Sequence, residues 1–132
     1  MATAARFQRT REDHARELAE DYVEMVRALI AETGEARAVD MAERLGVSPV
    51  TVGKTLKRLQ KEGLVTFQPY RSIFLTEEGQ ALAEESERRH LVVRDVLLKL
   101  GVDAETAETD AEGIEHHVSR ATLEAFAQYL KA

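Results

Sequence analysis

The sequence predicts a mainly α-helical protein with a small β-wing, in two domains: an N-terminal winged helix-turn-helix domain, residues 1–76, and a C-terminal all-helical domain, residues 77–132. Three observations predict this fold. Apolar residues recur at three- and four-residue steps in most segments, as in amphipathic helices. A Gly-Val-Ser turn at 46–48 joins two short helical segments. Two strand-like segments follow them directly.

The composition is that of an ordinary globular protein, with 132 residues of which 44% are hydrophobic and 32% are charged. Cysteine is absent, which excludes disulfides and thiolate metal sites and agrees with a reducing cytoplasm. No run of about 18 apolar residues exists, so no membrane partner is expected. The first ten residues have no apolar core and do not predict a secretory signal. These observations predict a cytoplasmic protein.

Charge is distributed unevenly along the chain, whose formal net charge is −6. Between Arg37 and Thr76 there are seven basic and three acidic residues, a local charge of +4, which leaves −10 for the remainder. A basic stretch within an otherwise acidic chain is the expected pattern of a DNA-contacting lobe.

Apolar residues at helical spacing predict a first helix from about Glu17 to Glu32, with Gly34 as its C-terminal cap. Residues 1–16 are polar and predict either a frayed arm or the solvated start of that helix. Asp21 and Glu24 are neighbours on the helix surface, because they are three residues apart. A solvated face is the alternative interpretation of this pair.

The helix-turn-helix consists of a short helix that ends at Gly46 and a second helix capped by Ser48 and ended by Gly63. The first is expected to bury Val39, Met41, Ala42 and Leu45, and the second to bury Val52, Leu56 and Leu59. The opposite face of the second helix, with its exposed start, would bind DNA. Its residues are Ser48, Pro49, Val50, Thr51, Lys54, Thr55, Lys57, Arg58 and Lys61.

These DNA-binding candidates have different expected roles. Residues near the start of a recognition helix reach base edges in the major groove. Lys54 could donate to guanine, and Val50 or Thr51 could contact a thymine methyl group. Lys57, Arg58 and Lys61 are expected to bind phosphates and to position the helix.

Residues 64–67 and 72–76 predict two strands joined by a turn at Pro69. A hairpin directly after a recognition helix is a wing. Arg71, near its tip, could reach a flanking phosphate or the minor groove, and an ordinary surface arginine is the alternative.

Thr76 is expected to cap a long helix that runs to about Leu100. Its second half, residues 91–100, is more apolar than a small core requires, which favours a dimer interface. A short acidic helix from Asp103 to about Glu108 is expected next, and Ser119 is expected to cap the last helix.

Residues 110–117, Asp-Ala-Glu-Gly-Ile-Glu-His-His, predict half of a metal site. In a helix, Glu112, Glu115 and His116 share one face, because they stand at positions i, i+3 and i+4. Two carboxylates and an imidazole can bind a divalent cation. Asp21, Glu24 and His90 are candidates for the other half. The alternatives are a capping box from Thr109 to Glu112, and a polar rim position for His90.

The chain resembles the diphtheria toxin repressor family, and within it the manganese transport regulators, from about Leu18 to Leu130. The similarity is most specific in the helix-turn-helix, in Glu-Asp-Tyr-Val-Glu-Met at 20–25, in Arg-Arg-His at 88–90 and in residues 110–117. It implies a homodimeric transcriptional repressor of metal homeostasis, not an enzyme, that binds double-stranded operator DNA when a binuclear Mn²⁺ site joins the first helix to the C-terminal domain.

The resemblance also implies the ligands of two Mn²⁺ ions per chain. Asp21 and His116 would bind one ion, Glu24 and His90 the other, and Glu112 and Glu115 both, with the main-chain oxygen of Glu112 as a further ligand. Iron-sensing relatives have Met and Cys in place of Asp21 and Glu112. Pro49-Val50 also departs from the family's commoner order.

The ligand chemistry agrees with manganese, because four carboxylates and two imidazoles without sulfur suit Mn²⁺ better than Zn²⁺ or Cu²⁺. Fe²⁺, Co²⁺, Cd²⁺ and Zn²⁺ are possible substitutes. The alternatives are an iron-responsive regulator of the same family and a winged-helix repressor that senses a small organic ligand. A two-metal hydrolase is disfavoured, since no further acid, base or nucleophile accompanies the site.

Overall fold

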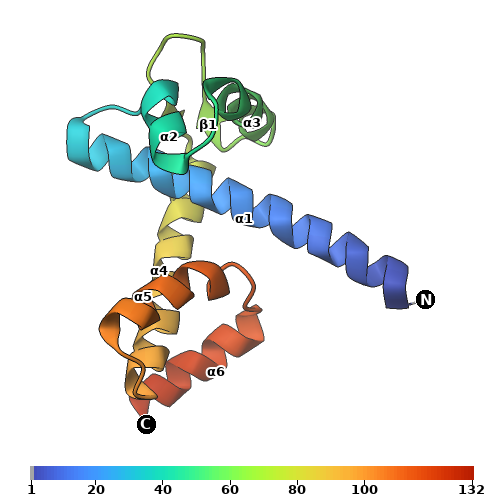
Figure 1. Cartoon of the computed structure of the whole chain (residues 1–132), viewed down its shortest axis with the longest axis vertical. Coiled ribbons are helices and arrows are strands. Elements are labelled where there is room, and N and C mark those ends of the chain that lie inside the picture. Colours follow the sequence, from blue (N-terminus) through green and yellow to red (C-terminus); the bar gives the residue numbers. More distant parts are fainter. Residues whose placement is uncertain (1) are drawn as a thin grey trace. The chain divides into compact units, whose positions relative to one another are not determined.

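The computed structural model describes residues 2–132. These residues form a mainly helical fold, which confirms the prediction (Figure 1). Its described residues form two compact units. The winged unit is Ala19–Glu84, and the helical unit is Glu85–Ala132 with the described residues before Ala19. No described helix is both long enough and apolar enough to cross a membrane. The elements in chain order are α1 (Ala2–Thr33), α2 (Ala38–Leu45), α3 (Pro49–Lys61), β1 (Val65–Thr66), β2 (Phe74–Leu75), α4 (Glu77–Lys99), α5 (Ala104–Ile114) and α6 (Arg120–Lys131).

The core of the winged unit is formed by apolar side chains from α1, α2, α3 and the wing. The prediction for the second helix is confirmed, because Val52, Leu56 and Leu59 are all fully buried. The prediction for Val39 is wrong, because this side chain is 68% exposed. In α2 the inward face follows Met41 and Ala42, and Val39 lies outside that stripe. The other large buried members of this core are Tyr22, Val23, Val26, Leu29, Val65 and Ile73.

The turn between α2 and α3 has the caps that the sequence predicts. Gly46 adopts a left-handed conformation with φ of 70°, and its amide donates to the carbonyl of Ala42 at 3.0 Å. The hydroxyl of Ser48 accepts a hydrogen bond from the amide of Thr51 at 3.1 Å. Pro49 occupies the first turn of α3, where a helix needs no amide donor. These caps define where α3, the predicted recognition helix, begins.

The wing is shorter than predicted, with two residues in each strand. Val65 pairs with Leu75, and Thr66 with Phe74, in antiparallel register. The amide of Ile73 also donates to the carbonyl of Ala36 at 2.8 Å, which adds a bridge from the segment before α2.

The helical unit contains most of α4 and all of α5 and α6. Ser119 caps α6 as predicted, since its hydroxyl accepts a hydrogen bond from the amide of Thr122 at 3.2 Å. Lys99 joins α4 to α6, because its ammonium group lies 4.4 Å from the ring centroid of Tyr129. The buried apolar residues of the unit are Val93, Val96, Ala107, Ala111 and Leu123.

Gly79, in the first turn of α4, is required by a close backbone approach. A Cβ atom added there would lie 2.0 Å from the carbonyl oxygen of Leu64, far inside van der Waals contact. We expect Gly79→Ala to destabilise the winged unit by about 1–3 kcal/mol, because backbone atoms cannot move aside at low cost. Urea unfolding followed by circular dichroism measures this.

Gly53→Ala is the matched control, since a Cβ added at Gly53, within α3, meets no atom within 4 Å. This change is expected to be neutral or to stabilise the protein by about 0.5–1 kcal/mol through higher helix propensity. Equal unfolding midpoints for the two variants would contradict the inferred contact.

Candidate metal centre and nucleic-acid interface

The candidate metal centre depends on where α5 begins and ends. Asp103 caps its start, accepting a hydrogen bond from the amide of Thr106 at 3.1 Å, and that bond lowers the pKa of Asp103. The predicted break after Glu108 is wrong, because α5 continues to Ile114. Thr109 therefore lies inside the helix, so the capping-box interpretation of Glu112 is wrong as well.

The residues after Ile114 leave the helix in a turn. Glu115 keeps helical dihedral angles, with φ of −56° and ψ of −31°, and its amide still donates to the carbonyl of Ala111. His116 lies in the turn that follows, so the predicted helical face ends at Glu115. Glu115 and His116 are each only 1% exposed, whereas the side chain of Glu112 is 60% exposed.

Four of the six predicted metal ligands lie in the helical unit, and the structure brings them together. His90, on α4, has its Nδ1 atom 2.7 Å from Oε2 of Glu115 and 3.7 Å from Oε1 of Glu112. The other oxygen of Glu115, Oε1, lies 3.3 Å from Nε2 of His116. The carboxylate of Glu115 is therefore shared between two imidazoles.

The two nitrogens of His90 have different surroundings. Nε2 lies at hydrogen-bond distance, 2.6 Å, from Oε1 of Glu108. Nδ1 is buried and makes no hydrogen bond to any described residue. A buried ring nitrogen that faces carboxylate oxygens without a hydrogen bond suits a shared cation. Glu108 was not among the predicted site residues, although its spacing of four residues from Glu112 places both on one face of α5.

The surroundings of His90 favour its protonated form when no metal is bound. Burial lowers the pKa of His90, but the hydrogen bond to Glu108 raises it, and so do the charges of the nearby glutamates. The net result is a pKa of His90 above its ordinary value. A cation bound at Nδ1 would take the place of a proton there.

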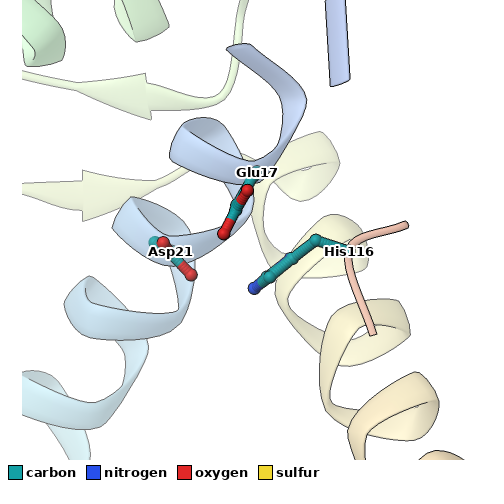
Figure 2. Close-up of side chains that lie close together, drawn as sticks. All are labelled: Glu17, Asp21 and His116. Atoms are coloured by element: carbon teal, nitrogen blue, oxygen red, sulfur yellow. The ribbon is translucent and has the colours of Figure 1, made fainter. Parts of the chain in front are cut away.

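The other two predicted ligands, Asp21 and Glu24, lie three residues apart on α1 within the winged unit, and both are half-buried. Figure 2 shows Glu17 and Asp21 projecting from successive turns of α1. Glu17 belongs to the helical unit, and one of its oxygens lies within 4.8 Å of a ring nitrogen of His116. Glu17 was not among the predicted site residues, although its spacing of four residues from Asp21 places both on one face of α1.

The donor atoms of the helical unit are carboxylate oxygens and imidazole nitrogens, with no sulfur. Such a set fits a hard or intermediate divalent cation better than a soft one. A further group that could hold a cation consists of His90, Glu108 and Glu112, each of which offers one donor atom within 4.8 Å of the others.

The predicted DNA-binding face lies on the exposed side of α3. This helix carries four basic residues, Lys54, Lys57, Arg58 and Lys61, and no acidic ones. All four are exposed, and Arg58 makes only a long ion pair with Glu62, at 3.6 Å. Ser48, Pro49, Val50 and Thr51 are also exposed, whereas Thr55 is half-buried.

Arg71 is exposed on the wing, as the DNA-binding prediction requires. Its neighbour Tyr70 is 99% exposed and has a positive φ of 64°, an unusual backbone conformation for a tyrosine. Tyr70 was not among the residues predicted to bind DNA.

Two family descriptions together match most of the chain. "Iron dependent repressor, N-terminal DNA binding domain" matches residues 15–73, and "Iron dependent repressor, metal binding and dimerisation domain" matches residues 76–132. The transcriptional regulator MntR of Escherichia coli O157:H7 is 58% identical over 120 residues, which cover 91% of this chain and 77% of the relative. The HTH-type transcriptional regulator MntR of Bacillus subtilis strain 168 is 40% identical over 100 residues, covering 76% and 70%.

Solved structures of similar fold include the manganese regulator SloR, with 29% identity and a TM-score of 0.73. A manganese-dependent transcriptional repressor in complex with manganese has 27% identity and a TM-score of 0.76. Each comparison covers 86% of this chain, but only 53% and 52% of the respective solved chains. The chain thus spans about half the length of these two structures.

Proposed function

Because the chain belongs to the iron-dependent repressor family, also called the diphtheria toxin repressor family, we propose that it is a manganese-responsive transcriptional repressor that binds operator DNA as a dimer. We propose residues 1–76 as the DNA-binding domain and residues 77–132 as the metal-binding and dimerisation domain. The regulators named MntR, at 58% and 40% identity, support the choice of manganese.

One observation carries the metal part of the proposal: the buried carboxylate of Glu115 lies between the imidazoles of His90 and His116, at 2.7 and 3.3 Å. A carboxylate shared in this way can bridge two cations. We propose two Mn²⁺ ions per chain, with Glu112 and Glu115 bound to both. His90 and Glu24 would complete one ion's site, and His116 and Asp21 the other.

The metal would act as a switch by linking α1 to the C-terminal domain. Without a cation, the clustered carboxylates repel one another. With two divalent cations, four carboxylates balance the charge, and Asp21 and Glu24 are bound to the same ions as the C-terminal ligands. Because α1 leads into the winged helix, metal binding would fix the recognition helices of a dimer at a spacing that DNA accepts. Because this coupling is reciprocal, operator DNA would increase the affinity for Mn²⁺ by the same factor by which Mn²⁺ increases the affinity for DNA.

The dimer would form through the apolar surface of the helical unit. Leu91 and Leu98, seven residues apart on one face of α4, are 39% and 40% exposed. Leu100, which follows α4, is 64% exposed. Apolar side chains left exposed in one region favour contact with a second copy of the chain.

A DNA mobility shift with and without Mn²⁺ tests the function. The DNA would be fragments selected from genomic DNA by the Mn²⁺-loaded protein, and the free protein would be sedimented to measure its mass. We expect two chains per particle, and a shift that chelation abolishes and Mn²⁺ restores. Mg²⁺ at the same concentration is the control cation, because it retains its water ligands and is a poor fit for imidazole donors.

Two results would contradict this function. Binding that is independent of metal and lost on adding a small organic molecule would favour the organic-ligand sensor. A stronger response to Fe²⁺ than to Mn²⁺ would favour the iron-responsive regulator.

The bridging role of Glu112 gives a second prediction. Glu112→Gln removes a negative charge between two cations, so Mn²⁺ affinity should fall by about 10-fold or more, since even outer-shell losses cost roughly 10–100-fold. Calorimetric titration of the metal-free protein with Mn²⁺ measures it. The control is Glu105→Gln, on the exposed first turn of the same helix. Unchanged affinity in Glu112→Gln would exclude Glu112 as a ligand.

The face of α3 gives a third prediction, which separates base contacts from phosphate contacts. Lys54→Ala should weaken binding to the selected operator more than to unrelated DNA, because Lys54 lies nearer the start of the helix. Lys61→Ala should weaken binding to both DNAs equally. It should also reduce by about one the number of counterions released on binding, which the slope of log K against log salt concentration measures. Titrations at several salt concentrations measure both effects. Identical behaviour of the two variants would show that the base-reading face is misassigned.

A further inference from the structure

The ring of His90 lies between two groups of carboxylates. On one side, Nε2 makes a hydrogen bond of 2.6 Å with Oε1 of Glu108. On the other side, Nδ1 lies within ion-pair distance of Oε2 of Glu115, at 2.7 Å, and of Oε1 of Glu112, at 3.7 Å, and makes no hydrogen bond to the part of the chain that the structure describes. The two nitrogens of one ring therefore have separate partners.

This arrangement follows from the spacing of residues on two neighbouring helices. His90 and Arg94 are four residues apart on α4, and Glu108 and Glu112 are four residues apart on α5. Residues at this spacing share a helix face. Besides its contact with His90, Glu108 has its Oε2 atom 3.8 Å from Nη1 of Arg94. Both oxygens of Glu108 are thus directed toward side chains of α4.

The contact with Glu108 determines which nitrogen of His90 can bind a cation. An ionised carboxylate can only accept hydrogen bonds, so Nε2 must be the donor. A cation that binds the ring must take the place of one proton, and because Glu108 accepts the proton on Nε2, the lone pair left for the cation is on Nδ1. Nδ1 is the buried nitrogen that faces Glu112 and Glu115.

We propose that Glu108 is a positioning residue for the metal centre: it accepts the Nε2 proton of His90 and holds the Nδ1 lone pair toward Glu112 and Glu115. This inference rests on the metal site proposed above. Metal-binding histidines commonly donate their second N–H to a carboxylate, which orients the ring and increases its basicity. In this role Glu108 acts through His90 and is not itself a ligand, in contrast to the alternative in which His90, Glu108 and Glu112 together hold a cation.

The ordinary alternative is that Glu108 forms a surface ion pair and nothing more. Its side chain is 51% exposed, and exposed ion pairs contribute little to stability. Under this alternative, replacing Glu108 would leave metal binding unchanged. The two interpretations therefore differ in metal affinity and in the state of the His90 ring.

Calorimetric titration with Mn²⁺ of three variants separates these interpretations. Glu108→Ala removes the acceptor, and its affinity for one Mn²⁺ should fall by about 10–100-fold. Glu108→Gln keeps an amide oxygen that can accept the Nε2 proton, so its affinity should lie closer to wild type than that of Glu108→Ala. Glu105→Ala removes the same charge one turn earlier on α5 and should bind as wild type. Urea unfolding of each metal-free variant verifies that it is folded.

Magnetic resonance of the protein labelled with ¹⁵N-histidine and loaded with ¹¹³Cd²⁺ reports on the ring directly. We expect cadmium–nitrogen coupling at Nδ1 of His90 and a downfield Nε2 proton that is slow to exchange. In Glu108→Ala the Nε2 proton should move upfield and exchange faster. Coupling at Nε2 would overturn the inference, because that nitrogen would then be the ligand.

Measured Mn²⁺ affinities separate a failure of the positioning role from a failure of the metal site. If wild type binds Mn²⁺ and Glu108→Ala binds it equally well, the positioning role is overturned and the metal site stands. If Glu108→Gln loses as much as Glu108→Ala, charge and not hydrogen bonding is responsible, and the role is overturned in that case too. If wild type binds no Mn²⁺, the proposed function and this inference fail together.

Discussion

The helical unit depends on the buried carboxylate of Glu115. A carboxylate with 1% exposure has lost its hydration, and it stays charged only if positive charge or hydrogen-bond donors replace the water. Two imidazoles lie beside it, one from α4 and one from the turn after α5. The end of α5 at Ile114 contributes to this arrangement. If the helix continued past Ile114, His116 would lie on the helix and not in the turn from which it contacts Glu115.

Exposure changes in steps across this centre. Glu115 and His116 are buried, His90 is 12% exposed at its side chain, and Glu108 and Glu112 are 51% and 60% exposed. The exposed carboxylates form a negatively charged rim, which attracts cations from solvent. The buried groups supply a dry interior where electrostatic interactions are stronger. The helical unit thus places exposed carboxylates beside buried carboxylate and imidazole groups.

The chain separates its two kinds of charge by element. The helix α3 has four basic residues and no acidic ones, although the whole chain has a net charge of −6. Surface charges act over about one Debye length, roughly 8 Å at physiological ionic strength, so local charge and not net charge decides what a surface binds. A strongly acidic cluster and a basic helix face can therefore coexist in one chain.

Local features were determined by the sequence alone, because each depends on residues a few positions apart. These include the mainly helical class, the turn with Gly46 and Ser48, the buried stripe of α3 and the cap of α6 at Ser119. The short-range errors include Val39, which was assigned to the buried face of α2 but is exposed, and the break predicted after Glu108, which α5 does not have. The predicted metal ligands rested on spacing and on a family resemblance, and the structure brings His90, Glu112, Glu115 and His116 into one region.

Only the tertiary structure decided which helix faces which. Helical periodicity shows which side of α5 carries Glu108 and Glu112, but not that His90, 18 residues before Glu108, lies opposite them. The sequence predicted the start of α5 at Asp103 but also a break after Glu108, whereas α5 continues to Ile114 and buries Ala107 and Ala111 on either side of that position. The physical reason is that caps and periodicity act within a turn or two of the chain, whereas the environment of a side chain depends on residues that are distant in sequence.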